Sequence, residues 1–135
     1  MFMNFNITIQ KVAILLFFIM FVYSGINKIP KFSKLVSGLA KKTQLPSPIN
    51  ELGMVGVILL EIIGALVVLY YFWFGEFKFN NIKLISKETV KYIILIFIAF
   101  MIVVTPLYHP PNKAIIPFLA NVTTTGGFLL IYNLL

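Results

Sequence analysis

The 135-residue sequence contains no cysteine, which excludes disulfide bonds, thiolate metal sites and cysteine nucleophiles. Any redox role would therefore need a bound cofactor, a quinone or a partner protein. Arginine is also absent, so that the net charge of +7 comes entirely from lysine. Because lysine lacks the planar fork of arginine, this composition argues against base-reading and bidentate phosphate sites, and we expect no nucleic acid partner.

Charged residues are scarce, at 11% of the chain, against about 25% in soluble domains. Hydrophobic residues make up 60% of the chain, and the mean hydropathy is +0.99. The deficit of charge predicts an integral, multi-pass membrane protein, whose first partner is the lipid bilayer. At this length we expect a single domain over residues 1–135.

Four apolar segments are expected to cross the membrane, at about residues 10–28, 52–74, 91–108 and 114–134. None alternates with a period of two residues, and backbone groups in lipid must be hydrogen-bonded internally, which leaves helices. The predicted fold class is therefore all-α, a transmembrane four-helix bundle. A cleavable signal peptide over the first segment is the alternative interpretation and would leave three spans.

An even number of spans places both termini on the same side of the membrane. Five lysines flank the spans on that side and six flank them on the other, so lysine counting leaves the side undetermined.

The connection between the first two spans has the pattern of a short amphipathic helix. Phe32, Leu35, Val36 and Leu39 recur at helical spacing over residues 31–42, opposite a set of lysines. This pattern predicts a basic helix that lies at the membrane interface. A solvated loop with accidental periodicity is the alternative.

Glu61 is the most informative residue, because it lies in the middle of an otherwise uncharged apolar span. An ionisable group at that depth is costly unless it is paired, protonated or beside a polar cavity. If four helices alternate in direction, the other polar residues in or next to the spans fall in the same membrane half, away from the termini, which we call the distal half. The candidate pocket residues are Ser24, Asn27, Lys28, Glu61, His109 and Asn121.

Two interpretations of this polar set stay open. In the functional one, Glu61 is a proton acceptor or ligand anchor at the floor of a pocket that opens toward the distal side, with Lys28, His109 and Asn121 around it. In the structural one, Glu61 pairs with Lys28, while Asn121 and the threonines after it form hydrogen bonds between helices. One histidine and one buried carboxylate are too few for a metal site, so no metal is predicted.

Glycines on three of the four spans are expected to allow close approach between helices. The candidate packing positions are Gly25, Gly64, Gly126 and Gly127.

Three stretches resemble the DoxX family of small four-helix membrane proteins. The run from Ser24 to Lys28 resembles the S-G-x-x-K element of that family, and the run from Glu61 to Ala65 resembles its E-x-x-G-G element. The run from Phe118 to Asn121, followed by Gly126 and Gly127, resembles the F-x-x-N…G-G-x-L-L ending, with His109 placed like the histidine before it. The chain departs from the family in its long lysine-bearing connection before the third span, and in Ala65, which replaces a usual glycine.

The resemblance implies a link to membrane-associated redox complexes. Our leading hypothesis is a small accessory subunit of a membrane oxidoreductase, whose polar pocket binds a small polar or quinone-like ligand. Its partners would be other membrane or peripheral redox subunits, and a homo-oligomer is compatible with it. The alternative is a non-catalytic assembly factor, chaperone or structural protein whose polar cluster holds the helices together. A small transporter is a third alternative, although four spans are few for one.

Overall fold

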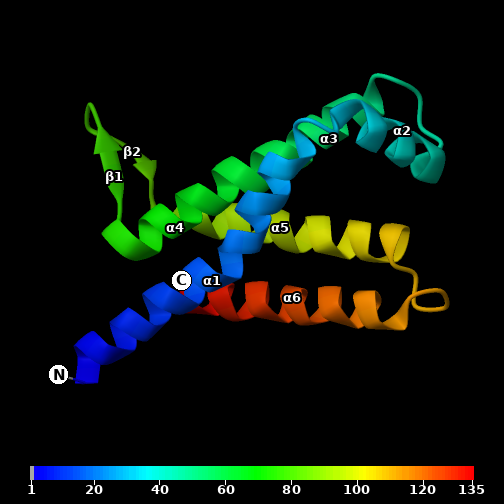
Figure 1. The fold of residues 1–135 in the computed structure, drawn as a ribbon. Helices are drawn as coiled ribbons and strands as arrows, with labels where there is room; N and C mark the ends of the chain where they lie inside the picture. The colour runs from blue at the N-terminus through cyan, green and yellow to red at the C-terminus, as the bar shows by residue number, and fades with distance from the viewer. Residues whose placement is uncertain (1) are drawn as a thin grey trace.

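The computed structural model describes residues 2–135, which form mostly helices (Figure 1). The elements in chain order are α1 (Phe2–Lys28), α2 (Phe32–Thr43), α3 (Ile49–Leu59), the π-helical turn η1 (Leu60–Gly64), α4 (Ala65–Phe74), β1 (Phe77–Phe79), β2 (Ile82–Ile85), α5 (Lys87–Tyr108) and α6 (Ile115–Leu134). Helix α3, the turn η1 and α4 follow one another without a break.

The four expected apolar helices are confirmed. Residues 5–28, 49–74, 87–108 and 115–134 each form a helix that is long and apolar enough to cross a membrane. Three of them start earlier than the hydropathy pattern predicts, because polar residues lie in their first turns. At the start of α5, the hydroxyl of Ser86 accepts a hydrogen bond from the backbone N–H of Thr89 at 3.2 Å, which caps the helix.

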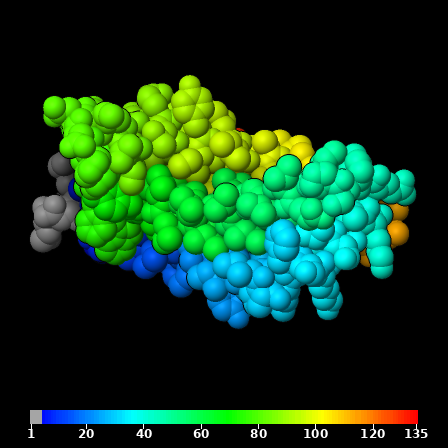
Figure 2. Space-filling view, turned by 90° about the horizontal axis from the view of Figure 1, so that it is seen from above, coloured from blue at the N-terminus to red at the C-terminus, as the bar shows by residue number. Residues whose placement is uncertain are grey.

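The elements divide between the two ends of the molecule. Figure 1 shows the β-strands, the start of α1 and the end of α6 at one end, which we call the terminal end. Helix α2 and the α5–α6 loop lie at the other, the distal end. In the space-filling view of Figure 2, the hairpin region in green and α2 in cyan again occupy opposite ends. Helices α5 and α6 run side by side, and α1 packs against η1 and α4.

The core is a cluster of phenylalanine rings from three helices. Phe18, Phe97 and Phe128 are fully buried. The Phe97 and Phe128 rings stack at 4.8 Å between centroids, and Phe18 meets both edge-on at 5.8 and 5.9 Å. Such aromatic pairs favour offset or edge-to-face geometry, so the cluster fixes α1, α5 and α6 relative to one another.

The β-hairpin is an addition to the all-α prediction. Strands β1 and β2 pair antiparallel around a two-residue loop, Asn80 and Asn81, with φ of 51° and 66°. Two consecutive residues with positive φ form the turn that matches the twist of a hairpin, and asparagine tolerates that conformation. The sequence carried this signal, because apolar residues alternate with Lys78 and Lys83 on either side of the asparagines.

The helix between the first two spans is confirmed as α2, one residue further along the chain than predicted. Its connection to α3 is held by Asn50, which is 3% exposed. The amide of Asn50 donates to the carbonyl of Leu45 at 2.7 Å and accepts from the hydroxyl of Thr43 at 2.7 Å. The placement of α2 at a membrane interface stays a prediction.

The four candidate packing glycines differ in their surroundings. A Cβ atom on Gly25 would lie 2.6 Å from Cγ1 of Ile62, and one on Gly64 would lie 3.4 Å from Cγ2 of Ile93. A Cβ atom on Gly127 would run into the ring of Phe17. At Gly126 a Cβ atom would meet nothing within 4 Å, so Gly126 is not at a close approach within the described residues.

Gly126 and Gly127 therefore make a matched pair for a stability test. We expect Gly127→Ala to lower the free energy of unfolding by about 1–3 kcal/mol relative to Gly126→Ala, because the added methyl displaces the packed ring of Phe17. Thermal unfolding of both variants in detergent micelles measures the difference. Equal midpoints would contradict the close α1–α6 contact.

Candidate functional site

The site begins with a π-helical turn in the second apolar helix. The backbone N–H of Ala65 donates to the carbonyl of Leu60, five residues earlier, so the turn that contains Glu61 is wider than an α-helical turn. Helix α1 approaches this turn closely because Gly25 has no side chain, as a Cβ atom there would lie 3.1 Å from Cβ of Glu61. Turns of this kind occur frequently at functional sites.

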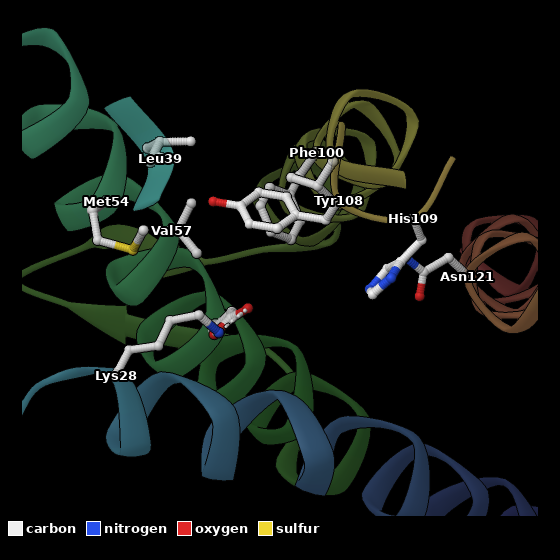
Figure 3. A pocket seen from close by; sticks show the side chains of 10 residues that line it. Lys28, Leu39, Met54, Val57, Phe100, Tyr108, His109 and Asn121 are labelled. Carbon is white, nitrogen blue, oxygen red and sulfur yellow. Dashed lines mark hydrogen bonds and ion pairs between the residues drawn. The ribbon is translucent and has the colours of Figure 1, made fainter. Parts of the chain in front are cut away.

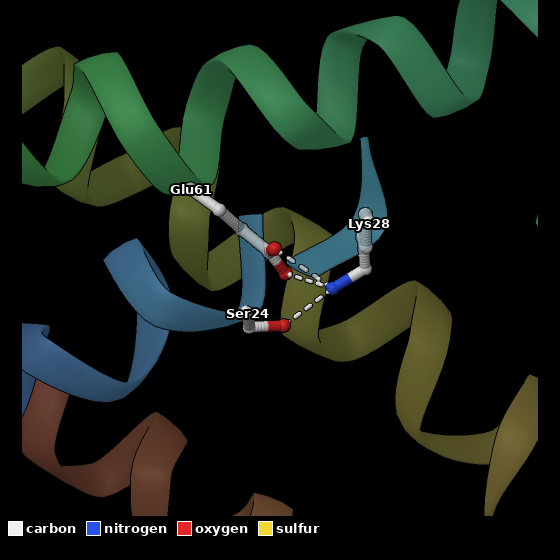
Figure 4. Close-up of polar contacts among 3 residues, drawn as sticks. All are labelled: Ser24, Lys28 and Glu61. Carbon is white, nitrogen blue, oxygen red and sulfur yellow. Dashed lines mark hydrogen bonds and ion pairs between the residues drawn. The ribbon is translucent and has the colours of Figure 1, made fainter. Parts of the chain in front are cut away.

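Glu61 forms an ion pair with Lys28. The Lys28 Nζ atom lies 2.8 Å from Oε2 and 3.1 Å from Oε1 of Glu61, and it also donates to the hydroxyl of Ser24 (Figure 4). The side chains are 5% exposed for Glu61 and 23% exposed for Lys28. Because a buried carboxylate is costly without a partner, the pair stabilises the approach of α1 to η1.

A cavity of about 240 Å³ opens beside this ion pair at the distal end (Figure 3). Its lining residues are Lys28, Leu39, Met54, Val57, Glu61, Phe100, Val104, Tyr108, His109 and Asn121. Figure 3 shows the His109 ring and the Asn121 amide next to each other, across the cavity from Lys28. The cavity therefore combines polar groups on two opposite sides with walls between them that are apolar except for the hydroxyl of Tyr108.

The structure brings four of the six predicted pocket residues to this cavity: Lys28, Glu61, His109 and Asn121. Ser24 lies behind them, hydrogen-bonded to Lys28. Asn27 is exposed on α1 and does not line the cavity. Helical geometry explains this division, because residues four apart, such as Ser24 and Lys28, share a face, whereas Asn27 is rotated away from Lys28.

The hydrogen bonds of the three threonine hydroxyls in α6 stay within that helix and do not connect it to another helix. The hydroxyls of Thr123, Thr124 and Thr125 each donate to the carbonyl four residues earlier in the same helix. In residues 2–135, the side chains of His109 and Asn121 appear in none of the hydrogen bonds found. Their polar atoms are therefore available to a molecule in the cavity.

Sequence reasoning did not find the apolar walls or Tyr108. Met54, Val57 and Glu61 follow helical spacing, and so do Phe100, Val104 and Tyr108, so each set could have been read as one helix face. Leu39 could not, because its place depends on how α2 folds back. The ammonium of Lys42 lies 4.8 Å from the centre of the Tyr108 ring, which links α2 to the end of α5 beside the cavity.

No protein family, curated protein or solved structure matches this chain. The resemblance to the DoxX family thus depends on the three motifs. Two of those motifs meet in the structure, because Lys28 from the first motif contacts Glu61 from the second. Ser24, also from the first motif, is hydrogen-bonded to Lys28.

We expect loss of one partner of the buried pair to be far more costly than loss of a partner of a surface pair. Lys28→Met leaves Glu61 buried without a counter-ion, which should lower stability by about 3–5 kcal/mol. The matched control is Lys83→Met, since Lys83 pairs with Glu76 at 3.1 Å with both side chains well exposed. That variant should lose at most about 1 kcal/mol.

Unfolding of both variants in detergent micelles, compared with Glu61→Met and with the double variant Lys28→Met/Glu61→Met, measures the coupling between Lys28 and Glu61. The double variant should recover much of the lost stability, because neither charge is then left buried alone. Similar losses for Lys28→Met and Lys83→Met would contradict a buried pair.

Proposed function

We propose that this protein is a DoxX-like, multi-pass integral membrane protein, a four-helix bundle with both termini on one side, whose distal cavity binds a quinone-like ligand. In this proposal it acts as an accessory subunit of a membrane oxidoreductase. The observation that carries the proposal is the cavity itself, in which a buried ion pair faces the side chains of His109 and Asn121. Within residues 2–135, neither of these two side chains forms a hydrogen bond.

The lining of the cavity suits a ring with polar atoms at its edge. Met54, Val57 and Phe100 offer apolar surfaces to the faces of a ring. His109 and Asn121 on one side can donate hydrogen bonds to a carbonyl oxygen such as a quinone head group presents, and the Lys28–Glu61 pair forms the polar surface on the other side. A ligand with an apolar tail would reach the cavity through the surrounding lipid.

The chain itself supplies proton-holding groups rather than electrons. Conversion of a quinone to a quinol consumes two electrons and two protons. The electrons would come from a partner redox subunit, since this chain contains no cysteine. His109 can hold a proton at a carbonyl oxygen of the ring, and Glu61 can keep the cationic Lys28 in place beside the cavity.

A structural role is the second candidate, and the completeness of the ion pair favours it. Glu61 is fully paired by Lys28, so the pair alone could hold α1 against η1 in a non-catalytic assembly or chaperone protein. That role leaves the cavity, His109 and Asn121 without a purpose. The two candidates therefore differ at His109 and Asn121, which can be changed without breaking the pair.

Binding of decylubiquinone to protein in lipid nanodiscs, followed by native mass spectrometry, tests the proposal. Wild type should bind, and Asn121→Leu should bind about tenfold more weakly, because one hydrogen bond to the ligand is lost. His109→Leu should weaken binding in the same way.

The matched control is Asn133→Leu, an exposed asparagine near the far end of the same helix, which should bind like wild type. Absence of binding by wild type, or equal binding by all variants, would refute the ligand site and leave the structural role.

A further inference from the structure

The hairpin between α4 and α5 has two chemically different faces. Phe79 and Ile82 are cross-strand partners, and they are 60% and 64% exposed. Lys78 and Lys83 are the next pair along, so their side chains lie on the opposite face of the ribbon. A two-stranded ribbon with one apolar and one basic face is amphipathic in the way that interfacial elements are.

The hairpin is fixed at the ends of two apolar helices. Helix α4 ends at Phe74, and β1 begins at Phe77. Strand β2 ends at Ile85, and α5 begins at Lys87. The hairpin therefore cannot lie far from the level at which α4 and α5 would leave the membrane. Figure 1 shows its strands running across the direction of α5 and α6, rather than continuing along them.

An aromatic surface joins the hairpin to α4. The ring of Tyr70 packs against Phe74 at 5.2 Å and against Phe77 at 5.9 Å between centroids. At the base of the hairpin, Ile85 packs against the hydrophobic core. Tyrosine rings such as that of Tyr70 are enriched at the level of the lipid head groups. The apolar face of the hairpin is thus continuous with the surface that lipid would cover.

The charges of the hairpin are unbalanced. Lys83 is paired with Glu76 at 3.1 Å. Two ion pairs are found within residues 2–135, and Lys78 belongs to neither. Lys87 and Glu88 follow in the first turn of α5 with opposite charges, so Lys78 carries the unbalanced positive charge. A lysine near the membrane surface attracts anionic lipid head groups.

From these observations we propose that the β1–β2 hairpin is a membrane anchor: it lies flat on the bilayer at the terminal end, with Phe79 and Ile82 in the acyl boundary and Lys78 against anionic lipid phosphates. This anchor is independent of any ligand in the distal cavity. Lipid is favoured over a protein partner because the two adjoining helices already place the hairpin at the bilayer surface.

Single-tryptophan reporters test the anchor. Trp73→Phe removes the native tryptophan, and Phe79→Trp or Lys78→Trp is then added. The proteins are reconstituted in phosphatidylcholine–phosphatidylglycerol vesicles that carry bromine near the carbonyl end of the acyl chains. Quenching at position 79 should be roughly twofold stronger than at position 78, because adjacent residues of a strand point to opposite faces. Aqueous acrylamide should give the reverse order.

Equal quenching at the two positions, or access of acrylamide to position 79 as great as to position 78, would overturn the anchor and indicate an aqueous or protein-bound hairpin. If Phe79→Trp does not fold, Ile82→Trp reports on the same face.

The lipid charge is tested separately, with Lys78→Gln added to the Phe79→Trp reporter. Replacing phosphatidylglycerol by phosphatidylcholine should reduce quenching at position 79 in the lysine form and leave it unchanged in the Lys78→Gln form. The matched control, Lys113→Gln in the distal loop, should retain the dependence on anionic lipid. Lack of any dependence in the lysine form would overturn the role of Lys78.

Discussion

The ion pair between Lys28 and Glu61 is the interaction on which the distal half of the structure depends. A carboxylate that is 5% exposed needs a counter-ion, and Lys28 can reach it because Gly25 lets α1 approach the second apolar helix. The wide turn at Glu61 and the hydrogen bond from Lys28 to Ser24 complete the arrangement. The cavity opens beside this pair, so the geometry of its polar side follows from the pairing.

The molecule thus combines two kinds of cohesion. The phenylalanine cluster around Phe18, Phe97 and Phe128 packs without polar groups, and it holds α1, α5 and α6 by shape. The distal half is held by charge and leaves a space of about 240 Å³. Large apolar side chains cover the outside of every long helix, as expected for surfaces that face lipid. The cavity beside the ion pair therefore does not interrupt the packing of Phe18, Phe97 and Phe128.

Much of this arrangement could be predicted from the sequence, because hydropathy defines long helices and their alternating direction places residues by depth. On that basis Lys28, Glu61, His109 and Asn121 were expected at the same end of the molecule, where they line the cavity. It failed where side-chain direction mattered: Asn27 has the right depth but faces outward, and Gly126 has open space beside it. The hairpin was missed because a short alternating pattern is weak next to long apolar runs. The place of Leu39 required the folded position of α2.

The π-helical turn determines which directions the two halves of the second apolar helix face. Because the turn holds an extra residue, the helix after it is rotated relative to an uninterrupted α-helix. Met54 and Val57 before the turn line the cavity, while Ala65 and Val68 after it fill the core. A single backbone thereby presents two differently aimed half-helices. In an uninterrupted α-helix of the same sequence, Met54 and Ala65 would lie on one face, so that this span could satisfy either the cavity or the core but not both.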